Sequence, residues 1–320
     1  MNRRQSVRTE SATIDEEFAA AVLAGLSAAP KRLPCRYFYD ARGSELFEEI
    51  TELEEYYPTR TELAILREHA GELAERAPPG AVLVEFGSGS SRKTEVLLDA
   101  MPNLGAYVAI DVSASALGGA RRRLEACYPR LRVITRTGDF RMPLDLPVEL
   151  ADAPRLGFFP GSTIGNLTRE EAVRLMGDMR RTLGAGARLV IGADLLKDEA
   201  RLLRAYDDAK GVTAAFNLNL LARINRELGA DFDLAGFAHE AYFDAGQSRI
   251  EMRLVSLRGQ EAHVLGRRFA FAPQERIHTE YSHKYTVEDF QALARRAGWS
   301  RVAVWRDAEL LFSVHELIAP

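Results

Sequence analysis

A regular alternation of short apolar runs and amphipathic segments between residues 81 and 195 constrains the fold of this chain more than any other feature. The apolar runs, of which AVLVEFG is the first, favour buried strands, and the segments between them have helical periodicity. Strand and helix alternating this regularly are typical of a parallel sheet with helices on both faces. We therefore expect an α/β fold with a mostly parallel, doubly wound, Rossmann-like sheet. The predicted strands are 81–87, 106–113, 131–139, 155–161 and 188–195.

The alternation stops after residue 195 and returns near the end of the chain. Residues 196–229 predict one or two helices, and the extended segments after them predict antiparallel hairpins with Gly-containing turns. A helix at 286–298 and two final strands would then close the sheet with an antiparallel edge. The expected parts are a polar tail at 1–12, a second, discontinuous α+β domain at 13–60 and 197–285, and the sheet domain at 61–196 and 286–320.

Composition and charge favour a small-molecule partner. The 42 basic and 46 acidic residues give a net charge of −4, which provides no field for nucleic acid or an anionic membrane. Cys35 and Cys127 are too few for a disulfide framework, and no Cys/His cluster suggests a metal. The polar N-terminus lacks the apolar core of a signal peptide, and no apolar run reaches membrane-spanning length. We expect a cytoplasmic location, no metal and, in the absence of an association motif, a monomer.

The stretch EFGSGSSRKT at 85–94 follows the first strand of the predicted sheet and resembles two different nucleotide-binding turns. A P-loop would need a glycine at position 92, where the backbone wraps around phosphates, and this chain has Arg92. The third glycine of a dinucleotide fingerprint falls at the same position. An NTPase is therefore disfavoured, and a dinucleotide-dependent oxidoreductase is weakened but stays open. A ligand with ribose and adenine but no phosphate, S-adenosylmethionine, suits the turn better.

Two further strand ends support this interpretation. Asp111, at the end of the second strand, is placed to accept hydrogen bonds from ribose hydroxyls. After the third strand, Asp139 can bind the adenine amino group while Phe140 covers the ring. An ordinary turn, a helix cap and core packing would explain each feature singly, but all three fall on the ligand-binding edge of the sheet. We predict a class I S-adenosylmethionine-dependent methyltransferase. The predicted cofactor-binding residues are Gly87, Ser88, Gly89, Lys93, Asp111, Asp139 and Phe140.

Seven motifs along the chain carry a more specific resemblance. They are LPCRYFYD (33–40), EEYYPTRTE (54–62), VEFGSGSSRKT (84–94), PGSTIGNL (160–167), RAYDDAKGVTAAFN (204–217), RIEMRL (249–254) and HTEYSHKY (278–285). From about residue 15 to its C-terminus the chain resembles the histidine Nα-methyltransferases of ergothioneine biosynthesis. The resemblance implies that S-adenosylmethionine methylates the α-amine of L-histidine three times to give hercynine. It also implies that the second domain binds the substrate.

The resemblance assigns residues to the amino acid's backbone. Asn166 lies in a loop that includes Gly161 and follows the fourth strand, and its amide can serve both an ammonium and a carboxylate. The resemblance implies that Asn166 and Tyr206 hold the substrate backbone, with Tyr39 near the amine and Tyr56 on the imidazole side. Tyr39 and Asn166 are the predicted catalytic residues, Tyr39 either relaying the amine proton or positioning the nitrogen.

Glu280 and Ser282 are the candidates for recognising the imidazole. Residues two apart in an extended stretch point the same way, so a carboxylate and a hydroxyl can satisfy both ring nitrogens. Met252 is expected to line the same pocket. His278 and His283 have no third metal ligand and are interpreted as surface or local hydrogen-bonding residues. A methyltransferase for tryptophan or tyrosine would carry an apolar residue in place of Glu280, and a catalytically silent adenosyl-binding protein is a further alternative.

Overall fold

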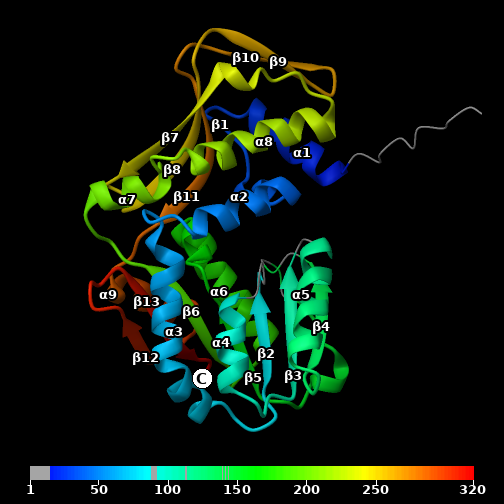
Figure 1. Cartoon of the computed structure of the whole chain (residues 1–320), viewed down its shortest axis with the longest axis vertical. Coiled ribbons are helices and arrows are strands. Elements are labelled where there is room, and N and C mark those ends of the chain that lie inside the picture. Colours follow the sequence, from blue (N-terminus) through cyan, green and yellow to red (C-terminus); the bar gives the residue numbers. More distant parts are fainter. Residues whose placement is uncertain (1–14, 88–91, 112–113, 139, 141, 143) are drawn as a thin grey trace, which may run out of the picture. The chain divides into compact units, whose positions relative to one another are not determined.

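The structure is a computed structural model that describes residues 15–87, 92–111, 114–138, 140, 142 and 144–320 (Figure 1). The chain forms two compact units. The described residues of the larger unit fall within 51–208, 242–251 and 281–320, and those of the smaller unit fall within 15–50, 209–241 and 252–280.

The larger unit is built on a seven-stranded sheet with the order β12-β13-β6-β5-β2-β3-β4 (Figure 1). The strands from β2 to β6 are parallel, and β13 runs antiparallel to both of its neighbours. The predicted mostly parallel sheet with an antiparallel edge is thus confirmed. The strands are β2 Val82–Phe86, β3 Ala106–Asp111, β4 Arg132–Thr137, β5 Arg155–Phe159, β6 Arg188–Asp194, β12 Ser300–Arg306 and β13 Phe312–Ile318.

Helices cover both faces of this sheet. Along β2 the side chains alternate as the period of a strand requires: Val84 packs in a core with α6 and α9, and Leu83 packs in a core with α3, α4 and α5. Thr168 and Glu171 form a reciprocal capping box that begins α6. The helices of this unit are α3 Tyr57–Arg76, α4 Arg92–Ala100, α5 Ala114–Cys127, α6 Arg169–Leu183, α7 Glu199–Tyr206 and α9 Val287–Arg296, with the 3₁₀ turns η2 Val148–Leu150 and η3 Thr163–Asn166.

The strand order determines where a ligand can bind in this unit. From β2 the chain builds outward through β3 and β4, and it then returns to the other side of β2 to place β5 and β6. The carboxyl ends of β2 and β5 therefore flank the point where the winding direction reverses, and doubly wound sheets bind their ligands at this crevice. Every strand end that the sequence analysis singled out belongs to this edge.

The smaller unit combines helices with strands, of which β1 runs parallel to β11 and β9 runs antiparallel to β10. Its core includes Phe38 of η1 and Phe216 of α8, whose ring centroids are 4.6 Å apart. One sheet has the order β1-β11-β8-β7, a separate hairpin pairs β9 with β10, and the boundary between the units falls within β7, β8 and β11. The elements are α1 Glu16–Ser27, β1 Lys31–Arg32, η1 Cys35–Phe38, α2 Ala41–Thr51, α8 Val212–Leu228, η4 Leu234–Gly236, β7 Phe237–Asp244, β8 Arg249–Ser256, β9 Gln260–Val264, β10 Arg267–Phe271 and β11 Arg276–His283.

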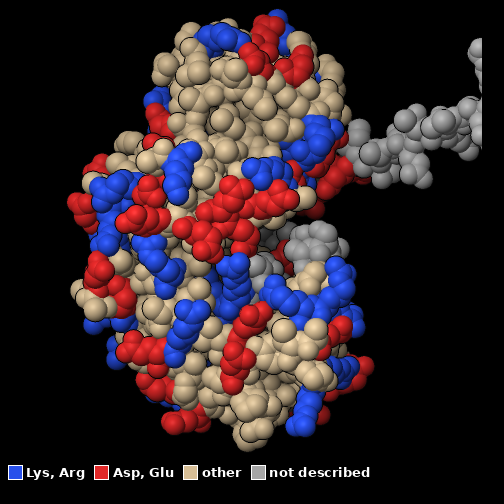
Figure 2. All heavy atoms as spheres, viewed as in Figure 1, with Lys and Arg blue, Asp and Glu red and all other residues tan. Residues whose placement is uncertain are grey.

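The surface carries both signs of charge. Figure 2 shows basic and acidic side chains intermixed over the face in view, in keeping with the small net charge of −4. Within the described ranges, none of the helices combines the length and the apolar character that crossing a membrane would require.

Candidate functional site

The carboxyl ends of β2, β3 and β4 form the first part of the candidate site. Gly87 follows β2 with a φ of +78°, and a Cβ at this position would lie 3.3 Å from Cε1 of Phe140. The turn therefore favours glycine both for its left-handed backbone and for the close approach of the aromatic ring. Asp111 is the half-buried last residue of β3, and its carbonyl oxygen accepts a hydrogen bond from the Gly138 amide at 3.0 Å.

The structure thus places Gly87, Asp111 and Phe140 at three adjacent strand ends, as doubly wound topology requires. The Phe140 ring also meets Phe159, at the end of β5, edge to face with centroids 5.6 Å apart. This edge offers an aromatic face and a carboxylate, which fit the adenine and ribose of an adenosyl ligand. Ser88, Gly89 and Asp139 were also predicted to bind this ligand, and they lie outside the described residues.

Glu62 connects the start of α4 to the loop after β5, and the sequence analysis missed it. Its carboxylate, 1% exposed, accepts a hydrogen bond from the Gly161 amide at 2.8 Å and pairs with the Lys93 ammonium at 2.6 Å. A Cβ on Gly192 would lie 2.0 Å from Glu62 Oε1, so this glycine provides the space for the carboxylate. In the sequence, Glu62 ends the EEYYPTRTE motif and is an acidic residue in a long predicted helix, which is ordinarily interpreted as a solvent-exposed charge.

The loop that carries Asn166 is held by backbone contacts. Gly161 and Ser162 adopt φ values of +84° and +54°, and η3 follows at Thr163–Asn166. A Cβ on Gly165 would lie 2.8 Å from the carbonyl oxygen of His283, so β11 and this loop pack without an intervening side chain. His283 Nδ1 donates to the Gly165 carbonyl at 3.0 Å, and burial lowers the pKa of this imidazole. His283 is therefore buried rather than at the surface, and its hydrogen bond reaches a residue 118 positions away in the sequence.

A buried network of charged and hydroxyl groups surrounds the end of β6. The Asp194 carboxylate is the hydrogen-bond acceptor for the Tyr57 hydroxyl at 2.8 Å and for the ammonium groups of Lys197 and Lys284, each at 2.6 Å. Burial by itself raises the pKa of Asp194, but the two ammonium groups more than offset it and the pKa lies below its ordinary value. We call this network the Asp194 cluster; its members are Tyr57, Asp194, Lys197, Tyr206, Ser282 and Lys284.

The Asp194 cluster brings together two residues that sequence reasoning had assigned to opposite ends of the substrate. The Tyr206 hydroxyl and Ser282 Oγ are 2.6 Å apart, and Lys284 donates to both, at 2.9 and 2.7 Å. The ring of Tyr56 meets that of Tyr206 edge to face, with centroids 6.2 Å apart. These predicted substrate contacts of the larger unit therefore lie close together, on the end of α7, the end of β11 and the residue before α3.

The remaining predicted substrate residues, Tyr39, Met252 and Glu280, belong to the smaller unit. Tyr39 is 38% exposed, and its ring packs edge to face against Phe47 and Phe216. Met252 in β8 and Glu280 in β11 are both buried. Glu280 lies two residues before Ser282 in the same strand, so the two side chains leave the same face of that strand.

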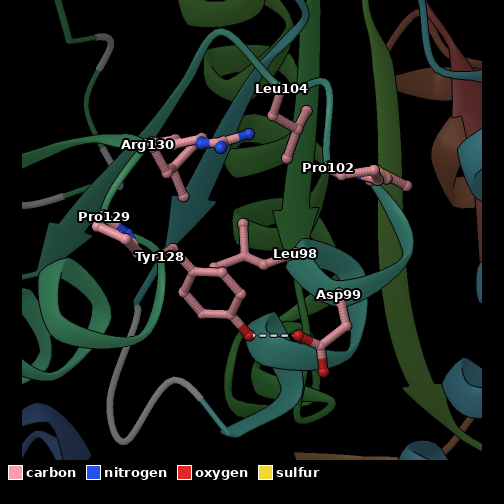
Figure 3. Close-up of a pocket in the computed structure, with 9 residues that line it drawn as sticks. Leu98, Asp99, Pro102, Leu104, Tyr128, Pro129 and Arg130 are labelled. Atoms are coloured by element: carbon pink, nitrogen blue, oxygen red, sulfur yellow. Dashed lines mark hydrogen bonds between the residues drawn. The ribbon is translucent and has the colours of Figure 1, made fainter.

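A surface pocket of about 350 Å³ lies at the opposite edge of the sheet (Figure 3). Leu104 precedes β3 and Leu131 precedes β4, so this pocket faces the amino ends of the strands. Its polar feature is a hydrogen bond of 2.7 Å from the Tyr128 hydroxyl to Asp99. None of the predicted site residues lines it, and we do not include it in the candidate site.

A buried carboxylate behind the glycine turn gives the first testable prediction. Glu85 of β2 accepts hydrogen bonds from Thr94 Oγ1 at 2.7 Å and from the Tyr107 hydroxyl. Burial raises its pKa from 4.5 to about 8, because the two hydroxyl donors offset only part of the cost of desolvation. Between these two pH values the folded chain binds more protons than the unfolded chain. The stabilisation is therefore complete below pH 4.5 and is lost as the pH rises through 8.

Between pH 5.5 and pH 8.5, we expect the free energy of unfolding of the wild-type chain to fall by a few kcal/mol more than that of Glu85→Gln, whose side chain cannot ionise. Each unit of pKa shift corresponds to about 1.4 kcal/mol. Urea unfolding at the two pH values measures this difference. Parallel losses in the two proteins would show that Glu85 does not titrate in this range.

The fold and the candidate site together define a class of protein. A seven-stranded sheet of this order, with a glycine turn after β2 and an acidic residue ending β3, is a class I S-adenosylmethionine-dependent methyltransferase. The model of the family "Histidine-specific methyltransferase, SAM-dependent" matches residues 18–319, and the chain belongs to this family.

Curated relatives extend over nearly the whole chain. This chain is 46% identical over 292 residues to a histidine N-alpha-methyltransferase of Mycolicibacterium smegmatis, and the match covers 89% of this chain and 90% of the relative. It is 42% identical over 292 residues to the protein of the same name in Mycobacterium tuberculosis, with the same coverage of both chains. Identity to ergothioneine biosynthesis protein 1 of Neurospora crassa is 34% over 288 residues, covering 86% of this chain and 32% of that longer protein.

Proposed function

We propose that this chain transfers methyl groups from S-adenosylmethionine to the α-amino group of L-histidine, forming hercynine as the first step of ergothioneine biosynthesis. The observation that carries the proposal is the family match over residues 18–319. The mycobacterial relatives, of which the chain covers 90%, are named for the same activity, and the Neurospora relative is named for the pathway.

The cofactor assignments follow the carboxyl edge of the sheet. We assign the adenosyl group to the turn after β2, with Asp111 accepting from ribose hydroxyls and Phe140 against the adenine. Gly87 supports this assignment, because the absence of a Cβ lets the backbone of the turn approach the Phe140 ring closely. Lys93 forms an ion pair with Glu62, so we propose that it helps to fix the position of the turn rather than offering its charge to the cofactor. Ser88, Gly89 and Asp139 complete the proposed cofactor-binding residues.

The substrate assignments follow from the chemistry of free histidine. We assign the carboxylate and amine to Asn166 and Tyr206, with the Gly161 loop beside them, and the imidazole to Glu280 and Ser282. Tyr56 and Met252 supply apolar surface, and Tyr39 lies nearest the amine. The smaller unit, which carries Tyr39, Met252 and Glu280, is then the part that selects the substrate.

The reaction is an in-line displacement. The lone pair of the α-nitrogen forms a bond to the methyl carbon while the carbon–sulfur bond breaks, and S-adenosylhomocysteine leaves with that electron pair. Before each of the three transfers one proton leaves the nitrogen, so three protons are released for each hercynine. Holding both reactants in line contributes roughly 7–11 kcal/mol toward lowering the barrier.

Tyr39 gives a prediction about partial methylation. As methyl groups accumulate, the nitrogen becomes a fixed cation, and aromatic faces favour such groups. Tyr39→Phe keeps the ring against Phe47 and Phe216 but removes the hydroxyl that we place near the amine. We expect a changed ratio of mono-, di- and trimethylated histidine, measured by mass spectrometry during the reaction. The same product ratios in Tyr39→Phe and wild type would show that the Tyr39 hydroxyl does not act on the amine.

The direct test of the proposed function is a mass-shift assay on free amino acids. The purified chain with S-adenosylmethionine is expected to add three methyl groups to histidine and to leave tryptophan and tyrosine unchanged. Methylation of either aromatic amino acid in preference to histidine would show that histidine is not the substrate of this chain. Calorimetry with S-adenosylhomocysteine and with NAD accompanies the assay, because binding of NAD alone would contradict methyl transfer altogether.

A further inference from the structure

We propose that Lys284 is a positioning residue for the substrate histidine, which it orients through the hydroxyl groups of Tyr206 and Ser282. This inference rests on the proposed function, in which these two hydroxyls contact the substrate. Lys284 lies in the HTEYSHKY motif, but no role follows for it from the sequence alone, and the proposal comes from its place in the Asp194 cluster.

The Lys284 side chain is completely buried and uses its three N–H donors on three partners. Its Nζ lies 2.6 Å from Asp194 Oδ2, 2.7 Å from Ser282 Oγ and 2.9 Å from the Tyr206 hydroxyl oxygen. A lysine is rarely buried in this way, and its charge requires a partner, which Asp194 supplies. The two hydroxyl contacts are therefore additional to the ion pair that keeps the charge in the interior.

These contacts determine which way the hydroxyl groups point. An ammonium group only donates, so each hydroxyl oxygen is an acceptor toward Lys284 and its hydrogen must point elsewhere. One of the two hydrogens serves the bond of 2.6 Å between Tyr206 and Ser282. Without Lys284, both hydroxyl groups would be able to turn their hydrogens inward and would lose the orientation that a bound substrate needs.

Lys197 offers a matched control within the same cluster. It donates to the same carboxylate, at 2.6 Å from Asp194 Oδ1, and its side chain is 8% exposed. Its other partners are the Tyr57 hydroxyl and the carbonyl of Leu195. Replacing either lysine by methionine removes one buried ammonium and leaves Asp194 paired with the other, but only Lys284→Met releases Tyr206 and Ser282.

The experiment compares Lys284→Met with Lys197→Met at saturating S-adenosylmethionine. We expect Lys284→Met to lower kcat/KM for histidine about 10–100-fold, the range for lost charged hydrogen bonds, mainly through a higher KM. The dissociation constant of S-adenosylhomocysteine, measured by calorimetry, should remain at its wild-type value. Lys197→Met should cause a much smaller loss. In the double variant Ser282→Ala/Lys284→Met the losses should be less than additive, because Lys284 acts through that hydroxyl.

Equal losses in the two lysine variants, or additive losses in the double variant, would overturn the inference and leave Lys284 as a counter-ion of Asp194. Thermal melting shows whether Lys284→Met folds. If it does not, Lys284→Gln takes its place in the same comparison, because glutamine keeps a polar end on a shorter side chain. The wild-type assay separates this inference from the proposed function. If the wild-type chain does not methylate histidine, the function fails, whereas wild-type activity with indistinguishable lysine variants overturns only the role of Lys284.

Discussion

Asp194→Ala is expected to destabilise the larger unit by about 3–5 kcal/mol, because it leaves buried charges without a partner. The Asp194 carboxylate is 1% exposed and is the counter-ion of both Lys197 and Lys284. Burial lowers the pKa of Lys197 to about 8 even with Asp194 present. Alanine would therefore force the lysines to lose protons or to draw water into the interior. Thermal or urea unfolding near neutral pH measures the effect.

Asp198→Ala is the control for the loss of an aspartate in the same region. Asp198 caps α7 by accepting a hydrogen bond from the Arg201 amide at 3.0 Å, and it lies at the surface. Loss of such a cap costs about 0.5–2 kcal/mol. Equal losses in the two variants would mean that the Asp194 cluster is not a buried charge network. The pKa of Asp194 is lower in the folded chain than its ordinary value. The contribution of Asp194 to the free energy of unfolding should therefore persist down to acid pH and disappear as the pH falls through the folded-state pKa.

Glu280→Ala is expected to reduce kcat/KM for histidine on the order of 10²–10³-fold while S-adenosylhomocysteine still binds. A site that hydrogen-bonds a polar group of its substrate loses the substrate when that bond is removed, and truncating one partner of a buried charged pair costs 2–5 kcal/mol. Glu280 is 8% exposed, so water does not readily replace its carboxylate. Steady-state kinetics with histidine and calorimetry with S-adenosylhomocysteine measure the two effects separately.

Two further variants sharpen this prediction. Glu280→Gln keeps the size and an acceptor oxygen, so it should lose less activity than Glu280→Ala. Glu261→Ala removes an exposed glutamate of the same unit, whose partner is Arg268 on the neighbouring strand, and should behave as wild type. Near-wild-type kcat/KM for histidine in Glu280→Ala would show that the imidazole binds elsewhere.

The sheet of the larger unit could be predicted closely because its signals are local. The run at 82–86 is fully buried on both faces, as its apolar composition indicated, and Gly87 takes the positive φ that a strand-to-helix turn at this position requires. β3 begins at Ala106 as predicted and ends at Asp111, inside the predicted strand 106–113. Because parallel strands present their carboxyl ends at one edge, predicting the strands also predicted which residues gather there.

The polar residues that hold the candidate site could not be predicted in the same way. Glu62 and Lys284 are charged residues that local patterning assigns to solvent, yet both are buried. Their partners lie far away in the sequence: 31 positions separate Glu62 from Lys93, and 90 separate Asp194 from Lys284. Pairings over such distances depend on the tertiary fold. They explain how the predicted site residues are held in place.

The most direct measurement of the central claim uses S-adenosylmethionine labelled with ¹³C in its methyl group. The purified chain is incubated with this compound and free histidine, and the product is examined by NMR. We expect all transferred label to lie in equivalent methyl groups on the α-nitrogen of one product, with the imidazole carbons and protons unchanged. Label on a ring nitrogen or on the carboxylate, or no transfer to histidine at all, would contradict the proposed function.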